Sequence, residues 1–277
     1  MYTALTIAGS DPSGGAGIQA DIKTMTAHGV YAMSAVTALT AQNTMGVTGI
    51  LEVPPEFLAA QLESVFSDIP PDGVKVGMLP SPALVHVVAE ELARRRPGAV
   101  VVDPVMVSTS GARLQAGTAL EAMCRELFPL ASLLTPNLPE AEALWGSPVR
   151  CPQEMEQAAQ AIGARYGCAV LCKGGHLEGD AADYLWQPGG GRWYRRERIC
   201  NPNAHGTGCT LSSAIVCHLA AGRPLEEAVS RAKDYVSGAL AAMLDLGRGN
   251  GPLDHAFAIR SGRFDHRSIT TGEDGRT

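Results

Sequence analysis

The sequence predicts an α/β fold, a three-layer sandwich in which a mostly parallel central sheet carries helices on both faces, with a small β-hairpin. Short β-prone segments alternate with helical patterns along most of the chain, which is typical of βαβ units. Some β-prone segments are wholly apolar, as at Val100-Val101-Val102, and this indicates strands that are buried on both faces. The chain has 277 residues, of which 45% are hydrophobic and 18% charged, so it can form one large globular domain.

The predicted elements follow one another in a regular order. The first strand ends in a segment dense in turn formers, Gly9 to Gly15, and a helix follows because Ile18, Ile22 and Met25 recur at helical spacing. The predicted strands are 3–8, 31–39, 74–77, 99–103, 132–135 and 169–173. The predicted helices between them are 17–29, 55–67, 82–95, 118–127 and 153–166.

The order changes towards the C-terminus. Two short β-prone segments, 183–186 and 192–199, flank a Pro-Gly-Gly-Gly turn and predict the hairpin. Two helices are predicted next, over 208–221 and 225–244, and Gly222 suits the position just after the first of them.

The domain organisation follows from these patterns. No repeat or linker divides residues 1–263, so we expect one domain there. Residues 264–277 are polar and aperiodic, and we expect them to form a disordered tail.

The chain is acidic. Its 22 Lys and Arg residues are outnumbered by 28 Asp and Glu residues, which gives a formal net charge of −6. This balance argues against non-specific binding to nucleic acid or to an anionic membrane. The N-terminus lacks a basic targeting segment, no apolar stretch reaches the ~18 residues of a membrane helix, and the cysteines form no CxxC pair. We therefore expect a cytoplasmic protein with reduced thiols and with no membrane or nucleic-acid partner.

Several common phosphate-binding and catalytic motifs are missing. None of the lysines follows a glycine, which excludes a Walker A loop, and no HRD, DFG, HExxH or GxSxG sequence occurs. The first turn, Gly9-Ser10-Asp11, does not match the dinucleotide-binding pattern GxGxxG. Any phosphate chemistry must therefore be built in another way.

The strongest local pattern is NAHGTGCT at 203–210, directly before an apolar helix. Glycines 206 and 208 at a helix start allow successive backbone N–H groups to point at one spot, where the helix dipole favours a phosphate or a transferring phosphoryl group. Cys209 lies in the first turn, where the same field lowers a thiol pKa, so we expect it to accept a proton near neutrality. The alternative is a loop whose glycines allow close packing, with Cys209 as a small buried residue.

A lysine and two acidic residues follow predicted strands. Lys173, in the segment KGGH, ends an apolar strand, where it can contact a nucleotide phosphate or simply extend to solvent. Asp103 and Glu140 both lie at the expected carboxyl edge of the sheet and can hold a hydrated Mg²⁺. Each of these two residues alone is equally typical of a turn or a helix cap.

Other side chains in the first third of the chain suit a heterocycle. Gln42 offers one acceptor and two donors, which can pair with a ring nitrogen and an exocyclic amine. Asp21, early in the first helix, and Met78, after a predicted strand, are candidates for the same pocket. The alternatives are a loop amide, a helix acid favoured by the dipole and a core methionine.

Long stretches of the chain resemble one known family. They are AGSDPSGGAGIQADIKT at 8–24, TALTAQNT at 37–44, VGML at 76–79, VDPVM at 102–106, LTPNLPEA at 134–141, KGGH at 173–176 and HGTGCTLSSA at 205–214. In these motifs and their order the chain is similar to the hydroxymethylpyrimidine/phosphomethylpyrimidine kinases of thiamine biosynthesis, in the ribokinase-like superfamily. The similarity covers residues 3 to about 260.

The resemblance implies a ribokinase-like fold and a kinase activity. The family transfers the γ-phosphoryl group of ATP to the hydroxymethyl group of 4-amino-5-hydroxymethyl-2-methylpyrimidine, and then phosphorylates that monophosphate to the diphosphate. The implied cofactors are ATP and Mg²⁺, while a requirement for a monovalent cation stays open. The implied partners are the pyrimidine and ATP. Because family members are often dimers, we also expect a homodimer, although no interface pattern is visible in the sequence.

The resemblance also implies roles for individual residues. Gly206, Thr207 and Gly208 would form an anion hole with Cys209, which would be the base for the substrate hydroxyl. Asp103 and Glu140 would hold Mg²⁺ through water. ATP would contact Lys173, Asn137 and His205, and the pyrimidine would contact Gln42, Asp21, Gly9, Met78 and Val105.

One residue and one short segment bear on ATP affinity and on closure of the site. Ala204 stands where relatives often carry Thr, so ATP affinity is weaker if that hydroxyl contacts the nucleotide. Residues 107–111 are small and polar, and we expect a flap that closes over the substrate.

Two other functions remain open. A pyridoxal kinase with cysteine at the same place would use the same chemistry, although Gln42 with Met78 favours the pyrimidine. A catalytically idle pyrimidine sensor is the second alternative. Such proteins usually lose a catalytic group, whereas Cys209, Lys173, Asp103 and Glu140 are all present.

Overall fold

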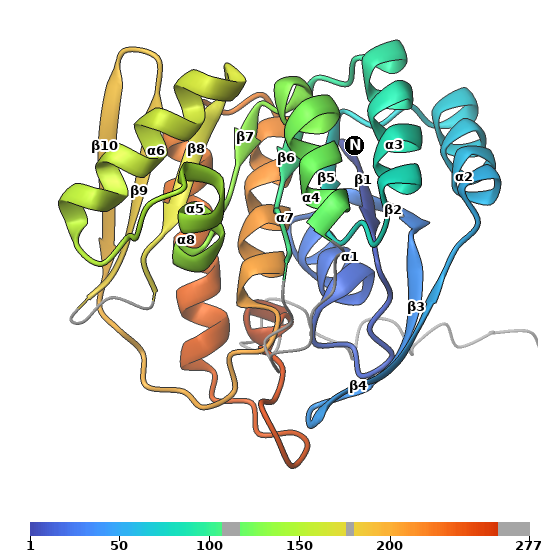
Figure 1. The fold of residues 1–277 in the computed structure, drawn as a ribbon. Coiled ribbons are helices and arrows are strands. Elements are labelled where there is room, and N and C mark those ends of the chain that lie inside the picture. Colours follow the sequence, from blue (N-terminus) through green and yellow to red (C-terminus); the bar gives the residue numbers. More distant parts are fainter. Residues whose placement is uncertain (107–116, 176–179, 260–277) are drawn as a thin grey trace, which may run out of the picture.

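An eight-stranded sheet lies at the centre of the protein, with helices on both of its faces (Figure 1). The structure is a computed structural model that describes residues 1–106, 117–175 and 180–259. The strand order is β10-β9-β8-β7-β6-β5-β1-β2, and all pairs from β2 to β8 are parallel. The strands are β1 (Thr3–Ala8), β2 (Tyr31–Val36), β5 (Gly73–Val76), β6 (Ala99–Val102), β7 (Leu133–Leu134), β8 (Ala169–Lys173), β9 (Ala181–Gln187) and β10 (Gly190–Arg196). The predicted mostly parallel α/β sheet is thus confirmed.

The predicted hairpin is formed by β9 and β10 and extends the main sheet. Strand β9 runs antiparallel to β8, with Cys172 opposite Tyr184, and β10 returns antiparallel to β9. Gly189 in the turn and Gly190 at the start of β10 have φ angles of 103° and 145°, which favour glycine.

The two faces of the sheet are covered by separate sets of helices because alternate residues of each strand point to opposite faces. On one face, Leu5, Ile7 and Val102 pack in a core with the first helix set. On the other, Ala4 and Val101 pack in a second core with the second set. The first set is α2 (Pro55–Asp68), α3 (Pro82–Arg95), α4 (Gly117–Ala122), α5 (Leu138–Trp145) and α6 (Pro152–Tyr166). The second set is α1 (Gly17–Ala27), α7 (Thr207–Ala220) and α8 (Leu225–Ala241).

The segment predicted as one strand over 31–39 is two strands in different sheets. After β2, the chain turns at Thr37, whose hydroxyl donates a hydrogen bond to the Met78 carbonyl at 2.7 Å. Strand β3 (Ala38–Asn43) then pairs antiparallel with β4 (Gly46–Glu52) in a separate two-stranded sheet. The prediction missed β4 because nearly all its residues are exposed, so the strand lacks the alternation of a half-buried one.

Two helical segments also differ from the prediction. Helix α5 was not predicted, although Asn137 and Glu140 form a capping box at its start. The helix predicted over 118–127 is α4 followed by a π-helical turn (Met123–Leu127) and a 3₁₀ turn (Phe128–Leu130).

Some expectations lie outside the described residues. These are the flap at 107–111, the tail at 264–277 and His176 of the KGGH segment. Within the described ranges, none of the helices combines the length and apolarity that spanning a membrane requires.

Candidate active site

A cavity of about 850 Å³ opens at the carboxyl ends of the parallel strands and at the start of α7. This is the edge of an open α/β sheet at which ligands bind. All but one of the predicted site residues line this cavity, and the exception is Asp21. Those that do are Gly9, Gln42, Met78, Asp103, Val105, Asn137, Glu140, Lys173, His205, Gly206, Thr207, Gly208 and Cys209.

The start of α7 depends on glycine. Gly206 has a φ of 83°, in the left-handed region, and a Cβ there would lie 1.8 Å from the carbonyl oxygen of Gly15. A side chain at this position would therefore be strained and would also collide with the loop before α1. At Gly208, a Cβ would lie 3.2 Å from Lys173 Nζ and 3.5 Å from Asp103 Oδ2, so glycine keeps this floor of the cavity open.

The first turn of α7 presents two backbone donors to the cavity. The N–H groups of Thr207 and Thr210 are bonded to the carbonyl oxygens of Ala204 and Gly206. Among the described residues, those of Gly208 and Cys209 have no acceptor. Two adjacent N–H donors at the positive end of a helix can donate hydrogen bonds to the oxygens of an anion.

The thiol of Cys209 is not acidified as expected. Burial is the largest influence and raises its pKa to about 11, whereas the charge of Lys75 and a hydrogen bond from the Gly17 backbone lower it less. The prediction of a lowered thiol pKa is therefore wrong, because burial, together with the nearby charges of Asp21 and Asp103, outweighs the groups that favour the thiolate.

A buried ion pair lies at the cavity floor, which Lys75 lines and Asp21 does not. The ammonium of Lys75, in β5, contacts Asp21 Oδ2 at 2.8 Å, and both side chains are fully buried. Asp21 also accepts hydrogen bonds from Thr6 at 2.6 Å and from Ser213 at 2.7 Å. Asp21 thus acts beneath the cavity, where it supports Lys75. The sequence analysis overlooked Lys75, although a lysine within the apolar strand Gly73-Val74-Lys75-Val76 was a sign of an internal partner.

Lys173 and Asp103 form a second ion pair, at the cavity wall. Lys173 Nζ lies 2.7 Å from Asp103 Oδ1, which also accepts a hydrogen bond from the Thr135 hydroxyl at 3.0 Å. In the described part of the chain, Oδ2 of Asp103 has no donor and is open to the cavity beside Gly208.

Glu140 and Asn137 cap the start of α5 together. The Asn137 N–H donates to Glu140 Oε2 at 2.8 Å, and the Glu140 N–H donates to Asn137 Oδ1 at 2.9 Å. From the described residues, Glu140 Oε1 accepts one long contact of 3.4 Å, from the Met106 N–H. Burial raises the pKa of Glu140 to about 7, against the lowering effect of Lys173.

The oxygens of Asp103 and Glu140 suit a hydrated Mg²⁺. This ion usually keeps several waters and takes one or two carboxylates together with substrate phosphates. One oxygen of each carboxylate is held by the protein, and the other is available to a hydrated ion. No group of three or more acidic, His or Cys side chains suited to a metal occurs within 1–106, 117–175 and 180–259. The residues present therefore fit an ion held largely through water and phosphate.

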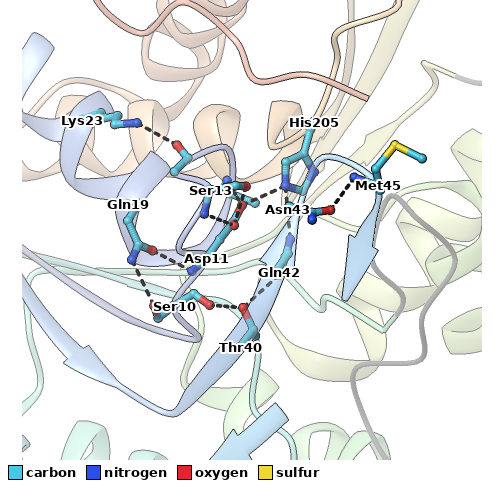
Figure 2. Close-up of polar contacts among 12 residues, drawn as sticks. Ser10, Asp11, Ser13, Gln19, Lys23, Thr40, Gln42, Asn43, Met45 and His205 are labelled. Atoms are coloured by element: carbon cyan, nitrogen blue, oxygen red, sulfur yellow. Dashed lines mark hydrogen bonds and ion pairs between the residues drawn. The ribbon is translucent and has the colours of Figure 1, made fainter. Parts of the chain in front are cut away.

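The structure places His205 beside Gln42 (Figure 2). Asp11 Oδ2 and Gln42 Nε2 lie 2.9 Å and 3.3 Å from the ring Nε2 of His205. Because Gln42 is within β3 and not in a loop, its side chain lies on the face of that strand that also bears Thr40. His205 therefore connects the loop before α7 to Gln42 and to the loop that contains Asp11, while its implied contact with ATP stays a prediction.

The other end of the cavity is lined by apolar side chains that the sequence analysis missed. They are Ile199, Leu211, Val236 and Leu240. Nearby, a buried pair of Lys233 and Asp183 holds the segment after Lys173, because Asp183 Oδ1 accepts the Gly174 N–H at 3.0 Å. These residues come from β9, α7, α8 and the segment after β10, so only the folded chain brings them to the site.

The fold and this site together define a class of protein. A cavity at the carboxyl ends of a mostly parallel sheet, with two backbone N–H donors at a helix start that can donate to a phosphate, is typical of small-molecule kinases with a ribokinase-like fold. The ADP complex of Bacillus subtilis pyridoxal kinase matches with a TM-score of 0.87 and 34% identity, over 94% of this chain and 99% of that one. Phosphomethylpyrimidine kinase from Clostridium difficile 630 matches with a TM-score of 0.77 and 43% identity, over 86% and 98%.

Sequence comparison identifies the family within this class. The family model for phosphomethylpyrimidine kinase matches residues 11–254. The hydroxymethylpyrimidine/phosphomethylpyrimidine kinase of Streptomyces coelicolor is 49% identical over 255 residues, 92% of this chain and 94% of that protein. The thiamine biosynthesis bifunctional protein ThiED of Geobacter sulfurreducens is 50% identical over 260 residues, 94% of this chain but 53% of that longer protein. The chain belongs to the phosphomethylpyrimidine kinase family and is a kinase, which argues against the idle sensor.

Proposed function

We propose that this kinase phosphorylates 4-amino-5-hydroxymethyl-2-methylpyrimidine with ATP, and then phosphorylates the monophosphate to the diphosphate used for thiamine. The names and identity of its relatives support this activity. The single observation that carries it is the cavity itself, which is lined by the two N–H donors of α7, by the polar side chain of Gln42 and by the apolar side chain of Leu240.

The proposed transfer depends mainly on charge and position. The N–H groups of Gly208 and Cys209 hold the transferring phosphoryl group, and Lys173 binds the ATP phosphates with help from the Asn137 side chain. Asp103 and Glu140 hold hydrated Mg²⁺, which neutralises phosphate charge when bound. The position of Lys173, 2.7 Å from Asp103 and next to the glycine floor, supports this assignment.

At the polar end, Gln42 binds the aminopyrimidine edge, with Gly9, Met78 and Val105 forming the walls. A Cβ at Gly9 would lie 3.0 Å from the Met78 sulfur, so a larger residue there would narrow the recess. Asp21 supports this end indirectly, through its ion pair with Lys75.

Cys209 is proposed as the proton acceptor for the attacking hydroxyl. Its place in the first turn of α7, beside the phosphoryl-binding N–H groups, supports this role. Because its pKa is raised to about 11, the active form is the small thiolate fraction. Phosphoryl transfer needs little help from a base, so a small fraction is compatible with turnover.

The experiment is ³¹P NMR of the purified protein with Mg-ATP, with the hydroxymethylpyrimidine and pyridoxal offered in parallel. Successive signals of the pyrimidine monophosphate and diphosphate support the proposal. Phosphorylation of pyridoxal alone would assign the protein to that second activity, which is favoured by solved pyridoxal kinases that match at 32–34% identity. Binding of the pyrimidine without transfer would contradict the proposal.

We also propose a homodimer that buries the β3–β4 sheet. This sheet carries the side chains of Leu39 and Leu51, which lie opposite each other across the two strands and are 50% and 67% exposed, and that of Ile50, which is 44% exposed on the other face. Apolar groups gathered on an exposed sheet are typical of an interface. Sedimentation equilibrium should give a dimer, and Leu51→Glu should shift it to the monomer, whereas an unchanged dimer mass would place the interface elsewhere.

A further inference from the structure

The side-chain amide of Gln42 is contacted at both ends by polar groups (Figure 2). Its Nε2 lies 3.3 Å from His205 Nε2, and its Oε1 lies 3.1 Å from the hydroxyl oxygen of Thr40. The oxygen and nitrogen of an amide group have nearly the same size and shape. Whether each neighbouring group donates or accepts a hydrogen bond therefore decides which of the two atoms faces it.

The ring nitrogen of His205 is a donor at this place. It lies 2.9 Å from Asp11 Oδ2. Burial raises the pKa of Asp11, but hydrogen bonds from His205, Ser13 and Ala16 outweigh burial and bring the pKa to about 2. The carboxylate is therefore charged and can only accept, so the proton between the two groups lies on His205 Nε2. A protonated ring nitrogen has no lone pair for an amide N–H.

The hydroxyl of Thr40 is an acceptor towards Gln42. It lies 2.8 Å from the carbonyl oxygen of Ser10, which can only accept. Its single proton is therefore used by Ser10, and Thr40 Oγ1 offers lone pairs to the amide. An amide oxygen at this place would meet those lone pairs, whereas an amide N–H would donate to them.

Both contacts favour the same half-turn of the amide about its last side-chain bond. After this turn, Oε1 of Gln42 faces the His205 ring N–H, whose single proton it shares with Asp11 Oδ2, and Nε2 donates to Thr40. Two partners from different segments thus select one orientation, because the reverse leaves two polar contacts mismatched. The half-turn needs no other atom to move.

The selected orientation fixes what a ligand meets. One Nε2 proton remains as a donor on the Thr40 side, and one Oε1 lone pair remains as an acceptor on the His205 side. A 4-aminopyrimidine matches this pattern with its ring nitrogen and its amine. A 4-oxo pyrimidine offers a ring N–H and a carbonyl, the opposite pattern, and would require a reversed amide.

We propose that Thr40 and the Asp11–His205 pair are positioning residues that hold the Gln42 amide in one orientation, and that this makes the site reject 4-oxo pyrimidines. The inference rests on the proposed function, since it concerns the ring that the kinase would phosphorylate. The fixed orientation of the Gln42 amide explains why the site would accept a pyrimidine with a 4-amino group and reject one with a 4-oxo group.

The test compares kcat/KM for the aminopyrimidine and its 4-oxo analogue in the wild type, Thr40→Val and Thr40→Ser. We expect the wild type to favour the amine by on the order of 10²-fold or more, because a mismatched polar pair is costly. Thr40→Val keeps the size and suits a strand, but removes the acceptor. It should lower the preference about tenfold, mainly through KM, whereas Thr40→Ser should keep it.

A second measurement tests the arrangement without substrate. Long-range ¹H–¹⁵N NMR of the histidine rings, with the signal of His205 assigned through His205→Asn, should show a protonated Nε2. An unprotonated Nε2, equal rates for the two pyrimidines, or equal ratios in Thr40→Val and Thr40→Ser would each overturn the inference while leaving the kinase intact. Absence of turnover with the aminopyrimidine would instead overturn the proposed function, and with it the substrate named here.

Discussion

Cys209 shows how two local effects on one thiol compete. The helix start and Lys75 favour the thiolate, but burial disfavours it more strongly and the pKa rises to about 11. About one thiol in 10³ is then ionised at pH 8. If the thiolate is the base, the rate depends on this small fraction.

The pH dependence of kcat tests the role of Cys209. We expect kcat to rise roughly tenfold per pH unit between about pH 8 and 10, because the thiolate fraction grows in that proportion below a pKa of about 11. Glu140, with a pKa of about 7, is already ionised in this range and adds no slope. Cys209→Ala removes the titrating group and should lower kcat and flatten the profile, whereas a wild type that is flat over this range would contradict the assignment.

The Lys75–Asp21 pair makes a prediction about stability. Lys75→Met leaves the fully buried Asp21 without its cation, and we expect a loss of about 3–5 kcal/mol in the free energy of unfolding. Lys75→Met combined with Asp21→Leu should recover most of this loss, because neither charge then remains buried. Urea titration of the two variants checks this, and an equal loss in both would show that packing, not charge, is involved.

Helix α7 has a glycine near each end, one packed against a neighbouring loop and the other in open space. Gly206, at its start, has a φ of 83° and contacts the loop before α1, whereas Gly222, after its end, has a φ of 73° and nothing within 4 Å of a Cβ. The backbone strain of a side chain is thus similar at the two places, while the steric clash is confined to the start.

These two glycines form a matched pair of variants. Gly222→Ala should cost about 1–2 kcal/mol of stability through its positive φ and leave kcat unchanged. Gly206→Ala should in addition displace the N–H donors of α7 and lower kcat by on the order of 10²-fold. Steady-state kinetics with denaturation curves separate the two effects. Equal kcat values in both variants would exclude the start of α7 as the phosphoryl site.

At the scale of the whole molecule, the Asp11–His205 contact joins parts of the chain that are 194 residues apart. Asp11 belongs to the loop between β1 and α1, and His205 to the loop before α7. The cavity lies between these loops, so this contact contributes both to the shape of the site and to the closure of the fold.

The Asp11–His205 contact should make the free energy of unfolding depend on pH in the acidic range. Because the folded pKa of Asp11 is about 2, below its ordinary value of 3.8, its contribution is complete above pH ~4 and is lost as the pH falls towards 2. Asp11→Asn should remove this part of the pH dependence, whereas Asp68→Asn, at an exposed carboxylate, should retain it. Urea midpoints between pH 2.5 and 5 check the prediction, and parallel curves for wild type and Asp11→Asn would contradict it.

The sequence was sufficient for the features that local patterns encode. The apolar strands, the glycines before α7 and Lys173 at a strand end were enough to predict the parallel sheet and most of the cavity lining. The raised pKa of Cys209 could not be predicted from the sequence, because the burial that raises it is a property of the assembled fold. The same holds for Lys75, whose partner Asp21 is 54 residues away, and for His205, whose place beside Gln42 results from contacts across 163 residues.

The direction of β1 has a practical consequence for handling this enzyme. Residue 1 is 96% exposed and precedes Thr3, whereas the other end of the strand reaches the cavity at Ala8 and Gly9. A tether attached at residue 1 therefore leaves the sheet on the side remote from the cavity. Protein immobilised on a solid support through this residue should keep its substrate entrance free, and the same point suits a fluorescent label for single-molecule work.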